Sequence, residues 1–170
     1  MSSAAGGDPA SEPLRHHPAF FQFWFSRITA SFAFQMLSVA VAWQIYEITN
    51  NPLHLGLIGL IQFIPSLLLA LPAGHFADQF ERRRIALTCQ IIEGIAIAVL
   101  AGGTLFGVLS EGLILGIVFV IGVAKAFEWP AMQSMVPALV PPAILPRAMA
   151  VNASAGQAAT IAGPALGGFL

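Results

Sequence analysis

Residues 53–73 read LHLGLIGLIQFIPSLLLALPA, and this stretch decides the class of fold. Its 21 residues include no Asp, Glu, Lys or Arg. The apolar residues follow one another without the polar–apolar alternation of a half-buried β-strand. About 20 apolar residues in an α-helix cross the ~30 Å hydrocarbon core of a bilayer. The stretch therefore predicts a transmembrane helix.

Four further apolar runs of similar length occur along the chain. We expect the five spans at Phe23–Tyr46, Leu53–Ala73, Ile85–Gly107, Leu113–Val136 and Ala148–Leu170. The connections between them contain polar residues, Pro or Gly and comprise residues 47–52, 74–84, 108–112 and 137–147. Because lipid offers the backbone no hydrogen-bond partners, a span must be a helix or part of a closed barrel, and continuous apolar runs favour helices. The expected fold class is an all-α polytopic membrane protein.

The composition of the whole chain agrees with this class. Hydrophobic residues make up 57% of the 170 residues and charged residues only 9%, against roughly 25% charged in a soluble domain. The net charge of −1 leaves no basic excess for binding phosphates, so no nucleic-acid partner is expected. No Cys/His spacing fits zinc, and no span holds paired Asp residues or a Ser/His pair. We therefore expect neither an enzyme nor a bound metal or cofactor.

The distribution of arginine predicts how the chain is oriented in the membrane. The six arginines are Arg15, Arg27, Arg82, Arg83, Arg84 and Arg147. They all fall on one side of the membrane if the N-terminus is cytoplasmic, as the positive-inside rule requires. Residues 1–18 contain no apolar core like that of a signal peptide. We expect them to form a disordered cytoplasmic tail, and residues 19–170 to form the transmembrane bundle.

Two expected spans carry stripes of polar or small residues at helical spacing. The stripe in the first span is Arg27, Ser31, Gln35 and Ser38, and the stripe in the fifth is Asn152, Gly156, Thr160, Gly163 and Gly167. Small residues and amides are common where membrane helices pack together. A second interpretation is that the stripes face a hydrated path for a substrate. The sequence leaves both interpretations open.

Three ionisable residues, Glu93, Lys125 and Glu128, lie within expected spans. Each costs about 2.5–3.5 kcal/mol at the centre of a membrane helix. Lys125 and Glu128 are three residues apart and can pair, and Glu93 is expected at a similar depth to Glu128. Desolvation raises the proton affinity of a carboxyl group, and a nearby ammonium lowers it again. A carboxyl group in such surroundings can serve as a proton carrier. The alternative is a static ion pair that only fixes the register of the helices.

The connection at residues 74–84 reads GHFADQFERRR and is more specific than an arginine cluster. Gly74 and Asp78 share one helix face, and Asp78 then lies beside the arginines at the cytoplasmic end of the spans. An anion at this place can cap the N-terminus of a neighbouring helix. The arginines alone are explained by membrane orientation, whereas Gly and Asp at these offsets are not.

These residues make the sequence similar to the major facilitator superfamily of secondary transporters. The superfamily's loop motif, Gly-x-x-x-Asp-Arg-x-Gly-Arg-Arg, is matched at Gly74, Asp78, Arg82 and Arg83. The sequence departs from the motif at Gln79, where Arg is usual, and at Glu81, where Gly is usual.

Two further segments carry the resemblance. The superfamily's antiporter motif, which is associated with exporters that exchange substrate for protons, is similar to the run that contains Gly163, Pro164, Gly167 and Gly168. Residues 125–142 resemble the drug/proton antiporter branch that includes bacterial enterobactin exporters.

The resemblance implies a fold of twelve helices in two halves, of which this chain supplies five spans. The chain reaches Leu170 with no polar flank, so we expect it to be an N-terminal fragment that lacks span six and the C-terminal half. The resemblance implies proton-coupled export of a small amphipathic molecule, such as a drug or siderophore, across the bacterial inner membrane. The alternative is a membrane bundle that does not transport and acts as a structural or assembly partner.

The resemblance also assigns roles to residues. Asp78 is expected to cap a helix of the missing half, and the antiporter motif is expected to pack against that half near the external face. Spans one, two, four and five border the central cavity in the superfamily, which favours Glu128 over Glu93 as the coupling residue. The candidates for proton coupling or cavity lining are Arg27, Gln35, Glu93, Lys125, Glu128 and Asn152.

Overall fold

The computed structural model describes residues 18–169, apart from the side chains of residues 76–78. The expected N-terminal tail lies almost wholly outside the described residues. The five helices, in chain order, are α1 (Pro18–Thr49), α2 (Leu53–Gln79), α3 (Arg82–Leu105), α4 (Glu111–Leu139) and α5 (Leu145–Gly167). Residues 18–169 contain no β-strand, and the all-α fold class is confirmed.

Polar residues in the turns end one helix and cap the next. Asn50 follows α1 with a φ of 49°, a left-handed conformation that asparagine tolerates better than most residues. The side chain of Asn51 then accepts a hydrogen bond of 3.0 Å from the backbone N–H of Leu53, where α2 begins. Ser110 caps α4 in the same way, with a bond of 3.3 Å from the N–H of Leu113. These caps let long helices follow one another with very short turns.

Three connections are shorter than the sequence predicts, and the first of them comprises residues 50–52 instead of residues 47–52. The helix α2 continues to Gln79, so only residues 80 and 81 separate it from α3, instead of residues 74–84. Only residues 140–144 separate α4 from α5, instead of residues 137–147. Residues 74–84 were expected to form a connection because they are polar and charged, yet most of them extend α2 or begin α3. For residues 137–147 the expectation failed because proline was expected to break the helices. Pro137 instead lies in the last turn of α4, and Pro146 lies in the first turn of α5, where a missing N–H costs little.

Four of the five helices in the described chain are long and apolar enough to cross a membrane, namely α1, α2 over Leu53–His75, α3 and α4. The helix α5 is not among them, although its 23 residues are long enough. Arg147, Asn152 and Gln157, together with many small residues, lower its mean hydropathy. The expected fifth span is therefore less apolar than the other four. Its expected insertion stays a prediction.

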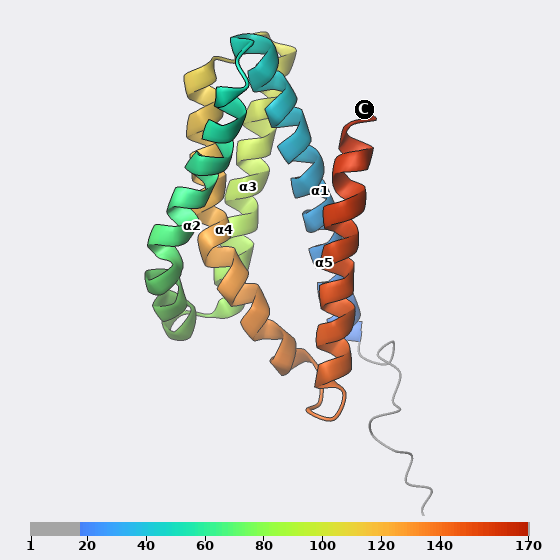
Figure 1. Cartoon of the computed structure of the whole chain (residues 1–170). Coiled ribbons are helices and arrows are strands. Elements are labelled where there is room, and N and C mark those ends of the chain that lie inside the picture. The colour runs from blue at the N-terminus through green and yellow to red at the C-terminus, as the bar shows by residue number, and fades with distance from the viewer. Residues whose placement is uncertain (1–17, 170) are drawn as a thin grey trace, which may run out of the picture. The chain divides into compact units, whose positions relative to one another are not determined.

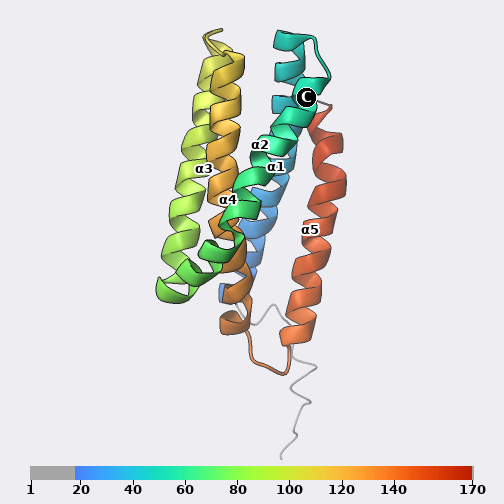
Figure 2. The ribbon, with the colours of Figure 1, turned by 60° about the vertical axis from the view of Figure 1, so that its left-hand side comes forward.

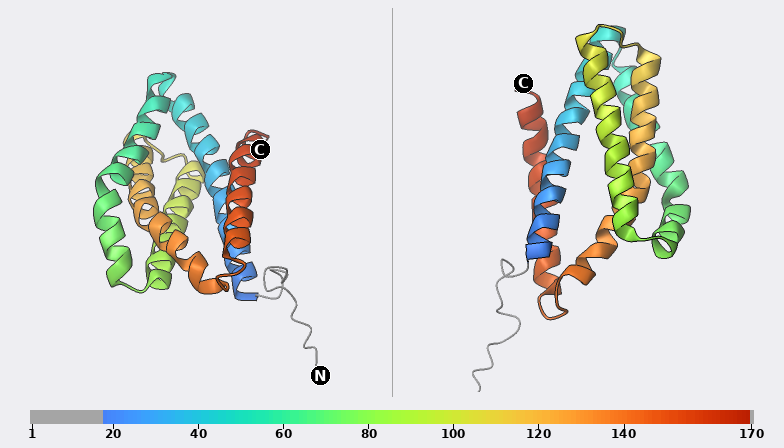
Figure 3. Two further views of the ribbon diagram at one scale, coloured as in Figure 1. Left: turned by 60° about the horizontal axis from the view of Figure 1, so that its bottom comes forward. Right: turned by 180° about the vertical axis from the view of Figure 1, so that it is seen from behind.

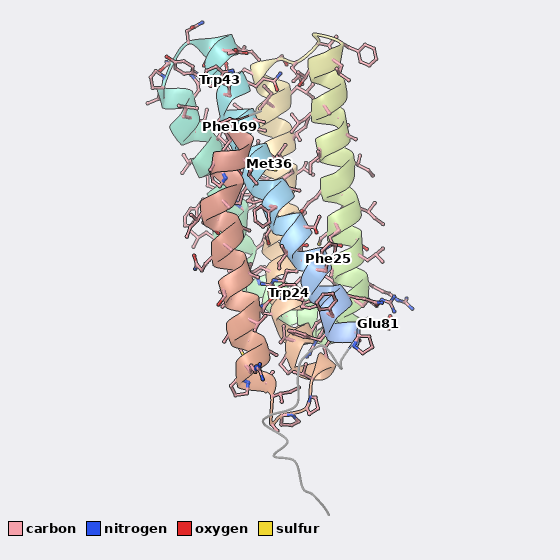
Figure 4. The ribbon with its side chains drawn as sticks, turned by 90° about the vertical axis from the view of Figure 1, so that its right-hand side faces the viewer. Trp24, Phe25, Met36, Trp43, Glu81 and Phe169 are labelled. Carbon is pink, nitrogen blue, oxygen red and sulfur yellow. The ribbon has the colours of Figure 1, made fainter. Side chains whose placement is uncertain are left out.

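The described residues form two compact units. The first contains residues 18–36 and 135–169, and in it α5 runs alongside the first part of α1 (Figures 1 and 3). Its core consists of the buried side chains Phe20, Val136, Val140, Ile144 and Ala148. Trp24, labelled in Figure 4, joins α1 to α5 through a hydrogen bond of 3.5 Å to the carbonyl oxygen of Val151.

The second unit contains residues 37–134, which are the rest of α1, all of α2 and α3, and most of α4. The α1–α2 and α3–α4 connections lie at one end of this unit and the α2–α3 connection at the other (Figure 1). The helices α3 and α4 run side by side (Figure 2). Ile45, Ile114 and Ile121 are fully buried in its core, whereas Leu71 and Ile95 are exposed, as side chains that face lipid would be.

Candidate functional site

The three ionisable residues of the spans come together in the second unit, between α3 and α4. Glu93 of α3 and Glu128 of α4 are 9% and 6% exposed. The Nζ atom of Lys125 lies 2.9 Å from Oε2 of Glu93 and 2.6 Å from Oε2 of Glu128. Lys125 and Glu128 share one turn of α4, and Glu93 approaches from α3. One ammonium group therefore serves two buried carboxyl groups, and we name these three residues the charge cluster.

Gln90 of α3 also contacts the charge cluster. Its side-chain Nε2 donates a hydrogen bond of 3.3 Å to Oε1 of Glu128. Gln90 lies three residues before Glu93 on α3, so the two share a helix face. Gln90 was not among the residues predicted from the sequence. The sequence signal for Gln90 was a side-chain amide one helical turn before Glu93, an acid within an expected span.

The two carboxyl groups of the charge cluster differ in how their oxygens are satisfied. Both oxygens of Glu128 accept a hydrogen bond, one from Gln90 and one from Lys125. In Glu93, Oε2 contacts Lys125, whereas Oε1 is buried without a hydrogen-bond partner among the described residues. A buried acceptor without a donor is costly, so this asymmetry needs an explanation.

The two polar stripes meet in the first unit, where α1 packs against α5. A methyl group on Gly163 would lie 2.5 Å from the Cβ atom of Gln35, so these residues already touch. Asn152 is buried at 8% exposure, and Arg27 is half-buried. The contact between Gln35 and Gly163 is the close helix packing that small residues permit. It favours the packing interpretation for these two positions.

The rest of the antiporter motif is more open. Pro164 and Gly168 are exposed, and Gly167 is half-buried. The contact observed for Gly163 is with α1 of the same chain. The expected packing of the motif against a second half stays a prediction.

Replacing Gly163 by alanine is expected to destabilise the protein by about 1–2 kcal/mol, because the new methyl group overlaps the Cβ atom of Gln35. Gly156→Ala is the matched control on α5, since open space surrounds the place of its methyl group within the described chain. Thermal unfolding of both variants in detergent measures the difference. Equal stability of the two variants would contradict the close packing of α1 on α5.

The loop motif contacts the last part of α4 through Arg82, at the start of α3. Arg82 donates a hydrogen bond of 2.7 Å from a guanidinium nitrogen to the carbonyl oxygen of Ser134. Arg84 pairs with Glu81 on the surface, and Arg83 is exposed. Sequence reasoning missed the contact of Arg82, because a backbone acceptor leaves no mark on residue type.

Two candidates of the loop motif, Gly74 and Asp78, lie on α2 itself. Gly74 is half-buried, and a methyl group there would meet no described atom within 4 Å. The side chain of Asp78 lies outside the described residues, so its capping role stays a prediction.

Two further polar contacts tie the helices together at the opposite end of the second unit. Nε2 of His54 lies 3.0 Å from Oε1 of Glu111, which joins α2 to α4. The Gln44 amide donates a hydrogen bond of 3.1 Å to the Thr104 hydroxyl, which joins α1 to α3. In the described part of the chain, no three His, Cys, Asp or Glu side chains are grouped as metal ligands would be.

Comparisons with known proteins place these features in a family. The family described as transmembrane secretion effector matches residues 9–170. Macrolide efflux protein A of Streptococcus pyogenes is 22% identical over 151 residues, which are 89% of this chain and 37% of that protein. The protein of the same name in a serotype M6 strain gives the same values. The chain thus spans about 37% of the length of these relatives. No solved structure matches.

The family match extends over nearly the whole chain and includes all five helices. It agrees with the resemblance carried by the loop and antiporter motifs, and it leaves the enterobactin branch as a finer prediction. The chain belongs to the transmembrane secretion effector family of the major facilitator superfamily.

Proposed function

We propose that this chain forms part of a secondary active transporter that exports a small amphipathic molecule in exchange for protons. The observation that carries the proposal is the charge cluster, in which two buried carboxyl groups share one ammonium group. Charged groups within membrane helices are costly, and they commonly mark ion or proton pathways. Membership in a secretion family and the name of the efflux relatives support the direction of transport.

The chemistry of the charge cluster suits a proton carrier. With both carboxyl groups ionised and Lys125 charged, the cluster has one excess negative charge, and a single proton makes it neutral. A movement that separates the ammonium from a carboxyl group would change which form is favoured. Alternation between two halves would supply that movement, because transporters of this superfamily rock about a central site.

Two resemblances support the proposed substrate class. The curated relatives are named for macrolide efflux, and residues 125–142 resemble a branch that includes exporters of enterobactin, a siderophore. Both types of molecule are small and amphipathic. We propose a substrate of this chemistry, with a macrolide as the first compound to test.

The test is accumulation of a macrolide in efflux-deficient bacteria that express the complete reading frame of the gene. The wild type is expected to lower accumulation, and a protonophore should abolish this effect. The double variant Lys125→Gln/Glu128→Gln should lose proton-dependent efflux, because Glu93 then keeps its proton without a nearby cation. The matched control is His54→Gln/Glu111→Gln, which neutralises a second pair between helices and should retain efflux.

Two outcomes would count against the proposal. Efflux that is insensitive to the protonophore would remove proton coupling. A double variant at Lys125 and Glu128 that behaves like the wild type would instead favour the alternative of a structural or assembly partner. The contact between Gln35 and Gly163 is the observation that keeps this alternative in view.

We further propose that the protein lies in the bacterial inner membrane with its N-terminus in the cytoplasm. Single cysteines at Asn51 and Arg83, in a Cys89→Ser background, report on the two ends of the second unit. An impermeant maleimide added to intact cells should label the cysteine at position 51 and leave the cysteine at position 83 unlabelled until the cells are opened. Labelling of both from outside would contradict this topology.

A further inference from the structure

The charge cluster holds two buried carboxyl groups, and ionising both of them is energetically unfavourable. Their Oε2 atoms lie within 2.9 Å of the same nitrogen, so the two groups are close neighbours. As whole residues, Glu93 and Glu128 are only 9% and 6% exposed. Two like charges at a buried site resist ionising together, and the single ammonium of Lys125 can offset only one of them, which favours a proton on one of the two groups.

The hydrogen bonds distinguish which group holds it. Glu128 accepts a donor on each oxygen, from Gln90 and from Lys125. Donors of this kind stabilise a carboxylate, and a proton on either oxygen of Glu128 would weaken the hydrogen bond that this oxygen accepts. Oε1 of Glu93 is buried and has no partner among the described residues. A proton on this atom would disturb no hydrogen bond seen among the described residues.

The protonation of Glu93 also depends on which other charged groups of the described residues in this unit face it. The charged groups that act on Glu93 are Lys125 and Glu128 of α4, and the buried thiol of Cys89 lies one turn away on α3. The helix α2 has no Asp, Glu, Lys or Arg between Leu53 and His75. The part of α1 in this unit has only Glu47, near the end of the helix.

We propose that Glu93, and not Glu128, carries the proton of the charge cluster, and that Gln90 is the positioning residue that selects it. Gln90 holds Glu128 as the carboxylate paired with Lys125, and the proton is left to Oε1 of Glu93. This assignment reverses the preference for Glu128 that the superfamily resemblance implied. Its use in transport rests on the proposed function, whereas the protonation itself does not.

The test is infrared spectroscopy of the protein reconstituted in lipid, because the C=O stretch of a protonated carboxyl group is separate from the bands of a carboxylate. Glu93→Asp and Glu128→Asp keep the number of charges and change only one side chain each. The band is expected to shift in frequency in Glu93→Asp and to keep its position in Glu128→Asp. A shift in Glu128→Asp alone, in both variants or in neither would overturn the assignment, as would the absence of the band from the wild type at every pH at which the protein stays folded.

The role of Gln90 is tested in the same spectra. In a Gln90→Leu background, Glu128 loses one donor, so Glu128→Asp should now shift part of the band. Gln44→Leu is the matched control, since it removes a hydrogen-bonded glutamine of the same unit that contacts Thr104 instead of the charge cluster. In that background Glu128→Asp should still leave the band unmoved. An unmoved band in the Gln90→Leu background would show that Gln90 does not select the proton site.

This measurement is separate from transport. If the spectra place the proton on Glu93 but efflux is insensitive to protons, the proposed function fails and the protonation site stands. If efflux is proton-dependent but the spectra place the proton on Glu128, only the assignment of Glu93 fails.

Discussion

Replacing Lys125 by glutamine is expected to destabilise the protein by about 3–5 kcal/mol, the usual cost of removing one partner from a buried ion pair. The side chain of Lys125 is only 24% exposed, and it contacts both buried carboxyl groups. The variant leaves Glu93 and Glu128 side by side without a cation. The free energy of unfolding, measured by titration with SDS in mixed micelles, gives the size of the loss.

Two further variants separate charge from packing. Lys125→Arg keeps the cation and should lose much less stability. Lys125→Gln/Glu128→Gln leaves Glu93 as a lone acid that becomes neutral on taking up a proton, so it should recover most of the loss. If Lys125→Gln alone matched the wild type, the charge cluster would contribute nothing to folding, and its two contacts would have no energetic meaning.

Replacing Gly122 by alanine is expected to destabilise the second unit by about 1–3 kcal/mol through overpacking. A methyl group on Gly122 of α4 would lie 2.9 Å from the carbonyl oxygen and 3.2 Å from the Cα atom of Gln62 in α2. Both are backbone atoms, so the neighbour cannot move aside by rotating a side chain. The two helices must separate or the new side chain must remain strained.

Two variants serve as controls for Gly122→Ala in the same unfolding titration. Gly116→Ala, on the same helix, places its methyl group where the described chain has no atom within 4 Å, and should be neutral or slightly stabilising. Adding Gln62→Ala to Gly122→Ala should leave the loss unchanged, because the overlap is with the backbone. Recovery of stability in that double variant would mean that the side chain of Gln62 is the obstacle instead.

The sequence predicted most of the fold, because lipid imposes a simple rule on composition. Continuous apolar runs define α3 and α4 closely and give the start of α2 but not its end, and the cost of charge in lipid singled out the three residues of the charge cluster. The sequence failed where proline was ambiguous, as at Pro137 and Pro146, since proline can end a helix or lie within its terminal turns.

The missed contacts share a physical cause. The bond from Gln90 to Glu128 and the approach of Gly122 to Gln62 depend on how each helix is rotated about its axis and where two helices cross. The bond from Arg82 to Ser134 ends on a backbone carbonyl, which every residue has. Residue spacing in a single sequence predicts which residues share a face of a helix, but it does not predict which residues of another helix contact that face.

The helices of this chain are unequal in length, with 32 residues in α1 and 29 in α4. At about 1.5 Å per residue, both exceed the ~30 Å thickness of the hydrocarbon layer. Such helices tilt, or they carry their ends into the headgroup region, and each adjustment has a modest energetic cost. Where the apolar stretch of such a helix is longer than the hydrocarbon layer, hydrophobic mismatch results, and the acyl-chain length of the host lipid then influences the tilt of the helix.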